Sequence, residues 1–228
     1  MVAVTKDNRH LRLLHDEVEF YCGNNLDPPL INLPDWESLP YDVFSPDQNI
    51  TSERLRTLAF LPELNRGLLL ITLESLIQRL PPPRHILAQT FLLAAGETLH
   101  IESLRKRLQS AGYRSVSQVM EPGEYAIRGG VVDIFPLGTT YPFRLDLFGS
   151  EIESIRIFDS ETQRSLKSVT DIDILPAREI SLTDESISFF RANFRKKFEG
   201  DPQQHIIYRE VSRGNLPNGL DYFFPLFF

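Results

Sequence analysis

A small group of side chains near the middle of the chain has the residue types and spacing of a protein interface. Arg128, Arg144 and Phe148 lie within the segment EPGEYAIRGGVVDIFPLGTTYPFRLDLFGSEIESIRIF, residues 121–158. An aromatic ring beside arginines is a mixture that interfaces favour at their energetic centres. The competing interpretation is an ordinary arginine–aspartate network with one exposed phenylalanine, since single exposed apolar residues are normal. The residue types alone leave both interpretations open.

A meander of four short strands is expected to position these side chains. Turn signals separate the runs, and the two-residue loop Gly149-Ser150 predicts a tight hairpin, because glycine supplies the positive φ that such loops need. Strand alternation directs successive side chains to opposite faces. The core face is expected to carry Phe143, Leu145 and Leu147, and the second face Arg144, Asp146 and Phe148. We expect this second face to be wet.

The hairpin loops also predict which residues lie opposite one another. The expected pairs are Phe148 with Glu151, Asp146 with Glu153, and Arg128 with Val131. Phe148 would then be a large apolar ring on a charged surface, with Arg128 at the end of the neighbouring hairpin.

Strands alternate with helices before the meander, which is typical of an open α/β sheet. The expected strands are 2–5, 30–32 and 68–72, and the expected helices are 8–21, 51–61 and 73–80. Asp7 or Asn8 would cap the first helix and Thr51 or Ser52 the second. The fully apolar run LLLIT at 68–72 suits a central parallel strand.

The triplet Pro81-Pro82-Pro83 predicts a stiff domain boundary. Beyond it, a small α+β domain is expected, with a strand at 90–94, a helix at 101–111, the meander, and a last hairpin arm at 169–175. The tail is helical again, with Asp184 as the expected N-cap. Its stripe at helical spacing, which we interpret as packing, consists of Ile187, Phe190, Phe194 and Phe198.

Composition bounds the function further. The chain has 228 residues and a net charge of −7, so it lacks the basic footprint of a free-standing binder of duplex DNA. Direct DNA binding through Arg128, Arg144 and Arg156 stays open as a third, less favoured interpretation. With one cysteine, Cys22, and no membrane-spanning run, we expect a cytoplasmic protein. Both termini carry apolar runs, which predicts a piece of a longer protein.

Catalytic motifs are missing from the sequence. There is no G-x-x-x-x-G-K-[ST] phosphate loop and no G-x-S-x-G elbow. The histidines at 10, 15, 85, 100 and 205 have no zinc-like spacing with one another or with Cys22. We therefore expect no catalytic residue, no cofactor and no metal in this chain.

Several ungapped blocks resemble the family of bacterial transcription-repair coupling factors, in their N-terminal region. They are LPDWESLPYDVFSPDQNITSERLRTL, GEYAIRGGVVDIFP, PFRLDLFGSEIESIRIFD and LPNGLDYFFPLFF. The excision-repair helicase subunit UvrB is similar and shares the R-G-x-V-V-x-I-F-P hairpin. UvrB carries a long tyrosine-rich hairpin that clamps damaged DNA, whereas here PYDVFSPDQNI runs directly into the helix expected at 51–61.

The resemblance implies a UvrB-like module in three parts. Residues 1–86 and 176–228 would form an interrupted, incomplete α/β domain, and residues 87–175 an inserted α+β domain that binds UvrA. The implied contact residues are Arg128, Arg144 and Phe148, which strand alternation also selects. The implied function is non-catalytic recruitment of UvrA to stalled RNA polymerase, whereas ATP, Mg²⁺ and double-stranded DNA would engage motor domains of the parent outside this chain. The alternative is a UvrB-like, ATP-dependent helicase core that engages DNA.

Overall fold

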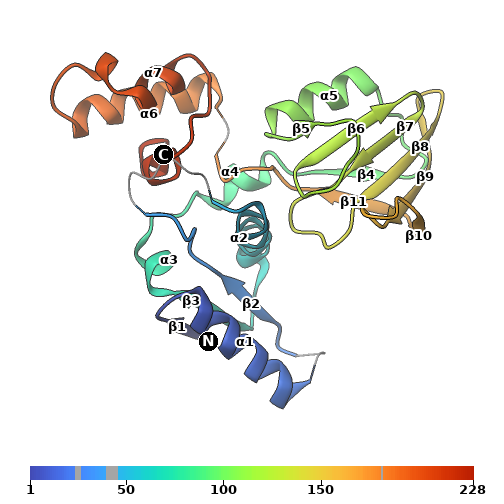
Figure 1. Cartoon of the computed structure of the whole chain (residues 1–228), viewed down its shortest axis with the longest axis horizontal. Helices are drawn as coiled ribbons and strands as arrows, with labels where there is room; N and C mark the ends of the chain where they lie inside the picture. Colours follow the sequence, from blue (N-terminus) through green and yellow to red (C-terminus); the bar gives the residue numbers. More distant parts are fainter. Residues whose placement is uncertain (24–26, 40–45, 181) are drawn as a thin grey trace. The chain divides into compact units, whose positions relative to one another are not determined.

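The structure of the chain, a computed structural model, describes residues 1–23, 27–39, 46–180 and 182–228. Its contacts divide it into two compact units (Figure 1). Unit 1 comprises Met1–Ile50, Pro62–His85 and Ile180–Phe228, and unit 2 comprises Thr51–Leu61 and Ile86–Glu179. The expected division of the chain differs from this one mainly at residues 51–61, which group with unit 2. None of the described helices is long and apolar enough to cross a membrane.

A three-stranded parallel sheet organises the first part of unit 1. Its order is β1-β3-β2, with β1 at Val2–Thr5, β2 at Leu30–Leu33 and β3 at Leu68–Thr72. The apolar strand β3 is central, as its composition predicted. Helix α1 (Asn8–Cys22) packs on this sheet, in contact with all three strands. The Asp7 side chain accepts a hydrogen bond from the His10 N–H at 2.9 Å, which confirms Asp7 as the N-cap.

The other helices of the first half differ from their predicted bounds. Helix α2 spans Gln48–Phe60, so it begins three residues before the predicted start, and the 3₁₀ turn η1 (Leu61–Glu63) follows it. The Asp47 carboxylate accepts from the Asn49 N–H at 2.8 Å, which supplies the cap that we had assigned to Thr51 or Ser52. Helix α3 covers only Leu73–Ile77. Residues 40–45, where the UvrB-type hairpin was predicted to be missing, lie outside the described residues.

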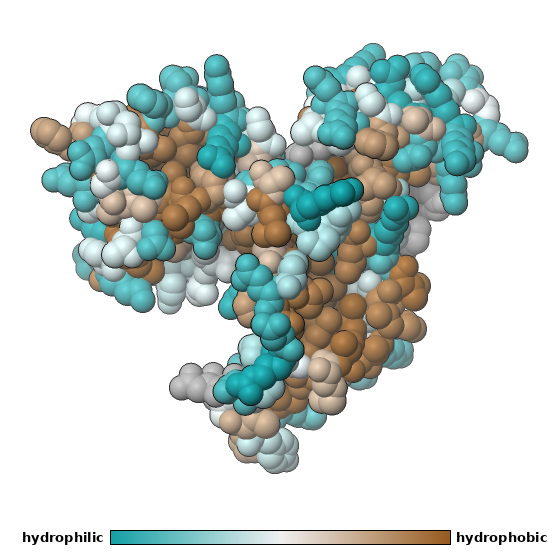
Figure 2. Space-filling model, turned by 180° about the vertical axis from the view of Figure 1, so that it is seen from behind, coloured by the Kyte–Doolittle hydropathy of each residue, from teal (hydrophilic) through white to brown (hydrophobic). Residues whose placement is uncertain are grey.

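Apolar side chains remain exposed on the part of unit 1 that holds the parallel sheet. Figure 2 shows apolar residues gathered over this region. The exposed large apolar residues on β1 and α3 are Val2, Val4, Leu73, Leu76 and Ile77. Parallel sheets are usually covered on both faces, so a surface of this kind is unusual on the outside of a domain.

The C-terminal part of unit 1 is built from helices around aromatic rings. The elements are α6 (Asp184–Lys197), η2 (Pro202–Gln204), α7 (Ile206–Ser212) and η3 (Asp221–Leu226). Phe190 and Phe194 are buried in one cluster with Trp36, and Ile187 and Phe198 pack against it, which confirms the predicted packing stripe. The N-cap of α6 is Thr183 rather than Asp184, because Thr183 and Ser186 form a reciprocal capping box.

Unit 2 is dominated by a six-stranded sheet in the order β10-β9-β8-β7-β6-β5. The strands are β5 (Arg114–Ser115), β6 (Glu124–Arg128), β7 (Val131–Ile134), β8 (Phe143–Phe148), β9 (Glu151–Phe158) and β10 (Ser165–Val169). Strands β6 to β9 pair antiparallel in sequence order, which confirms the predicted meander. The combination of a parallel α/β sheet with this antiparallel domain confirms the predicted fold class.

The register of the meander confirms two predicted pairs and corrects the third. Arg128 lies opposite Val131, and Phe148 lies opposite Glu151. Asp146, however, pairs with Ser154 rather than Glu153, because the register shifts between Asp146 and Leu147. Such an irregularity inserts an extra residue into one strand. Pairs beyond it are therefore shifted by one residue from those counted from the hairpin loop.

Three further elements lie wholly in unit 2 (Figure 1), namely β4 (Phe91–Ala94), α5 (Ile101–Ser110) and β11 (Asp171–Ile174). The short helix α4 (Pro83–Leu87) spans the boundary between the two units, which falls after His85. The predicted arm at 169–175 is therefore β11, which pairs antiparallel with β4 in a separate two-stranded sheet. Leu104 and Leu108 of α5 are buried, in keeping with the predicted inward face of that helix.

Candidate functional site

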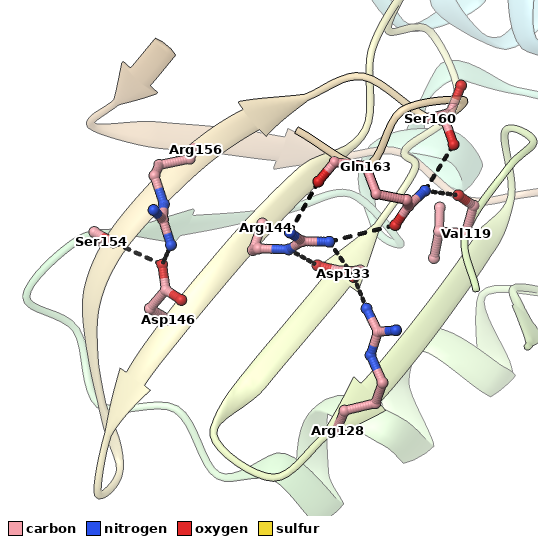
Figure 3. Close-up of polar contacts among 9 residues, drawn as sticks. All are labelled: Val119, Arg128, Asp133, Arg144, Asp146, Ser154, Arg156, Ser160 and Gln163. Atoms are coloured by element: carbon pink, nitrogen blue, oxygen red, sulfur yellow. Dashed lines mark hydrogen bonds and ion pairs between the residues drawn. The ribbon is translucent and has the colours of Figure 1, made fainter. Parts of the chain in front are cut away.

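The second face of the meander holds two arginines around one buried carboxylate (Figure 3). Arg144 Nε donates to Asp133 Oδ1 at 2.6 Å, and its Nη2 donates to Oδ2 at 2.9 Å. Arg128 donates from Nη2 to the same Oδ2. Asp133 lies opposite Arg144 in the sheet and has no exposed surface (0%). Both predicted arginines are therefore brought together on one face.

Phe148 stands at the end of β8, beside the turn that follows Arg128. Its relative exposure is 79%. The Leu147 N–H donates to the Gly130 carbonyl at 2.7 Å, which holds the end of β8 against that turn. A Cβ atom on Gly130 would lie 3.0 Å from the Leu147 carbonyl oxygen, so this close approach favours glycine. Phe148 and Arg128 thus belong to one rim of the sheet, as predicted.

Arg144 is more enclosed than the other two predicted residues. Its side chain is 18% exposed, and its guanidinium carbon lies 4.5 Å from the centroid of the Phe158 ring. Gln163 accepts from Arg144 Nη1 through its backbone oxygen at 3.3 Å. The hydrogen bond to Asp133 raises the pKa of Arg144, in spite of partial burial. Arg144 is therefore a charged brace between elements, whereas Arg128 and Phe148 are the exposed members of the predicted group.

A separate ion pair lies farther along the same face. Arg156 donates from Nη2 to Asp146 Oδ2, and the Ser154 hydroxyl donates to the same oxygen at 2.9 Å (Figure 3). All the arginines considered for DNA contact, including Arg156, therefore carry carboxylate partners. Such pairing reduces the positive potential that phosphate binding needs.

This face is not wet along its whole length, contrary to prediction. A small apolar cluster covers the end away from Phe148 and consists of the buried residues Val119, Ala126, Phe135 and Phe158, with Val116 packed against them. The segment after β5 supplies two members of this cluster. Strand alternation assigns a face but does not show which distant segment folds over it, whereas Phe148 and Arg128 at the other end stay exposed.

Glu124 anchors the segment that closes this cluster. Its carboxylate accepts from the N–H groups of Met120 at 2.8 Å and Glu121 at 3.0 Å, and from Arg114 Nη2 at 2.7 Å. Burial alone would raise the pKa of Glu124, but these hydrogen bonds outweigh it and lower the pKa below the usual value of 4.5.

The lowered pKa predicts a defined pH dependence of stability. The unfolded chain binds the Glu124 proton more tightly, so the stabilisation is complete above pH 4.5 and is lost as the pH falls through the lower folded-state pKa. Glu124→Gln should destabilise the chain by about 1–3 kcal/mol at pH 7 and by less at low pH. Thermal melts of both proteins across pH 3–7 test this, and an equal difference at every pH would contradict it.

Asp133 is the residue that sequence reasoning missed. It lies in the run Val131-Val132-Asp133-Ile134, where a polar residue with apolar neighbours on a predicted strand is the available signal. Among the residues that the structure describes, no group of three or more His, Cys, Asp or Glu side chains could hold a metal ion. The site is thus an assembly of hydrogen-bond donors and one exposed ring on a sheet, which suits recognition of another protein.

Comparison with known proteins agrees with this class of site. Residues 91–180, which include the whole meander, match the UvrB interaction domain. The chain is 43% identical over 228 residues to the transcription-repair-coupling factor of Escherichia coli (strain K12), which covers 100% of this chain and 20% of that protein. It is 48% identical over 198 residues to that of Haemophilus influenzae, covering 86% of this chain and 17% of that protein.

The same factor of Staphylococcus aureus (strain USA300) is 34% identical over 203 residues, which is 85% of this chain and 17% of that protein. The chain thus spans about a fifth of the length of the curated relatives it matches. Residues 91–180 define a UvrB-type interaction domain. The chain as a whole is similar to a segment of the transcription-repair-coupling factors, and the resemblance seen in the sequence is confirmed.

Proposed function

We propose that this chain is a non-catalytic module that binds UvrA, and that Arg128, Arg144 and Phe148 form its binding surface. The observation that carries the proposal is an almost fully exposed phenylalanine beside a half-exposed arginine, on a sheet that matches the UvrB interaction domain. The names of the relatives, transcription-repair-coupling factors, support a role in joining transcription to repair.

Physical chemistry favours binding at this rim. Exposing the Phe148 ring to water is unfavourable, and burying it in a pocket of the partner recovers that free energy. Arg128 can form bidentate bonds to a partner carboxylate. Both residues stand on paired strands, so little conformational entropy is lost when the partner binds.

In the longer parent protein, this module would recruit UvrA to a stalled RNA polymerase. ATP, Mg²⁺ and double-stranded DNA would engage motor domains of an ATP-dependent translocase outside this segment, and the parent would act in the cytoplasm. Residues 1–86 and 176–228 would correspond to the interrupted first domain of UvrB and residues 87–175 to its inserted second domain. This chain would need no cofactor.

A titration with purified UvrA tests the proposal. The wild-type chain should bind, and the triple variant Arg128→Ala, Arg144→Ala, Phe148→Ala should lose at least 30-fold in affinity, because truncated hot-spot residues cost about 2 kcal/mol or more. Circular dichroism of the triple variant checks that it stays folded. Unchanged affinity of a folded triple variant would refute the assignment of the surface.

Nucleotide binding distinguishes the proposed non-catalytic module from the alternative, a UvrB-like helicase core. We expect no saturable binding of ATP to the chain, because its sequence has no phosphate loop. A submicromolar ATP affinity would favour the helicase core. DNA affinity with a steep dependence on salt would instead favour direct contact with phosphates.

A further inference from the structure

The Asp133 carboxylate lies where burying a charge is energetically unfavourable. Its side chain is fully buried, and its neighbours Val132 and Ile134 on the strand are also buried. A buried carboxylate costs free energy unless ion pairs and hydrogen bonds offset its desolvation, and an apolar residue would often serve packing equally well. The side chains that are hydrogen-bonded to Asp133 therefore indicate its role.

Both carboxylate oxygens of Asp133 are occupied by arginines of the candidate site. Oδ1 accepts from Arg144 Nε at 2.6 Å, while Oδ2 accepts from Arg144 Nη2 at 2.9 Å and from Arg128 Nη2 (Figure 3). The bond pattern to Arg144 is bidentate, which fixes the plane of its guanidinium group. The Asp133 carboxylate on β7 thus fixes the positions of two arginine side chains, Arg128 on β6 and Arg144 on β8.

Gln163 completes the arrangement from the other side of Arg144. Its φ of 60° is in the left-handed region that non-glycine residues rarely adopt. The Gln163 side chain donates to the carbonyl oxygens of Val119 at 3.2 Å and Ser160 at 2.7 Å, and accepts from Arg144 Nη2 at 3.4 Å. Strained residues of this kind persist where their surroundings hold them, and they concentrate at functional sites.

The two arginines consequently differ in what they offer a partner. Arg144 donates hydrogen bonds from Nε, Nη1 and Nη2 to Asp133 and Gln163, and its side chain is only 18% exposed. Arg128 is anchored to Asp133 through Nη2, and half of its side chain (50%) is exposed at the rim. A partner can reach Arg128 without breaking the bonds of Arg144.

We propose that Asp133 is a positioning residue of the binding surface. It locks Arg144 in place and holds the tip of the half-exposed Arg128 side chain over the sheet, so that the rim accepts a partner carboxylate at Arg128 while Phe148 enters an apolar pocket of the partner. This inference rests on the proposed function, since the partner at this rim is taken to be UvrA. It adds that the arginines act as a unit ordered by an acid that the partner never touches.

The variant Asp133→Asn tests the inference because it keeps the size of the side chain and removes its charge. The matched control is Asp146→Asn, which breaks an arginine pair on the same face. We expect the dissociation constant for UvrA to rise at least tenfold for Asp133→Asn and less than threefold for Asp146→Asn. Equal effects of the two variants would overturn the positioning role.

A double-mutant cycle separates positioning from a general loss of stability. If Asp133 acts through the arginines, adding Asp133→Asn to the variant Arg128→Ala, Arg144→Ala should change UvrA affinity less than twofold. If Asp133→Asn lowers UvrA affinity as much in this double variant as it does in the wild-type chain, the inference is overturned.

NMR of the arginine side chains tests the positioning of Arg144 first in the wild-type chain alone. In the wild-type chain alone, Arg144 should show an Nε–H signal protected from exchange with water, and a freely exchanging signal would overturn the inference. In a folded Asp133→Asn chain this protection should be lost. If the wild-type chain fails to bind UvrA while the protection is present, the proposed function fails and the positioning of the arginines by Asp133 stands.

Discussion

Truncation of Phe148 to alanine is expected to weaken UvrA binding about 30-fold or more, which corresponds to about 2 kcal/mol. The ring is exposed in the free chain and makes no large contribution to its core, so the loss should appear in binding and hardly in stability. Titration calorimetry with purified UvrA measures the first quantity, and thermal melts of the chain measure the second.

Phe20 offers a matched control for this prediction. It is also an exposed phenylalanine, with a relative exposure of 81%, but it lies on α1 in unit 1, outside the segment that matches the interaction domain. Phe20→Ala should leave UvrA affinity within twofold of the wild type. If both truncations weaken binding equally, general surface hydrophobicity, rather than the rim beside Arg128, drives association.

The largest effect on stability is expected for Arg54→Ala, at about 3–5 kcal/mol. Arg54 on α2 has no exposed surface, and its Nε donates to Glu179 Oε1 at 2.5 Å. Removing the cation leaves the Glu179 carboxylate, which is 2% exposed, without this partner in a buried site. Both residues belong to unit 2, and the pair joins segments 125 positions apart in the sequence. Urea unfolding monitored by circular dichroism measures the loss.

An exposed ion pair in the same chain provides the control. Arg66 bonds both carboxylate oxygens of Asp27 at 2.7 and 2.8 Å, but the side chains of both residues are 73% exposed. Arg66→Ala should therefore cost no more than about 1 kcal/mol, since solvent screens such pairs. A cost for Arg54→Ala as small as that for Arg66→Ala would show that the buried pair does not hold unit 2 together.

Local signals in the sequence were sufficient for the strands that present the rim. Alternation and the Gly149-Ser150 loop predicted the pairs of Phe148 with Glu151 and Arg128 with Val131, because tight hairpins fix the register of neighbouring residues. Gly149 has a φ of 64°, as that loop requires. The register places Phe148 on the second face at the end of β8, where its ring is 79% exposed.

Features that depend on distant segments were not predicted. The irregularity near Asp146 shifts the pairing with β9, and no residue type announces it. The cluster around Phe158 depends on where the segment after β5 folds, and the pairing of β4 with β11 joins residues far apart in the chain. The role of Asp133 was missed for the same reason, since its partners come from neighbouring strands.

Site-specific photo-crosslinking tests the central claim most directly, because it asks which surface touches UvrA. A benzophenone amino acid at position 148 replaces one exposed ring with another, and the same substitution at position 20 is the control. On irradiation with UvrA, we predict a covalent adduct from position 148 and none above background from position 20. Adducts from position 20 alone would contradict the proposal that the rim formed by Phe148 and Arg128 is the UvrA-binding surface.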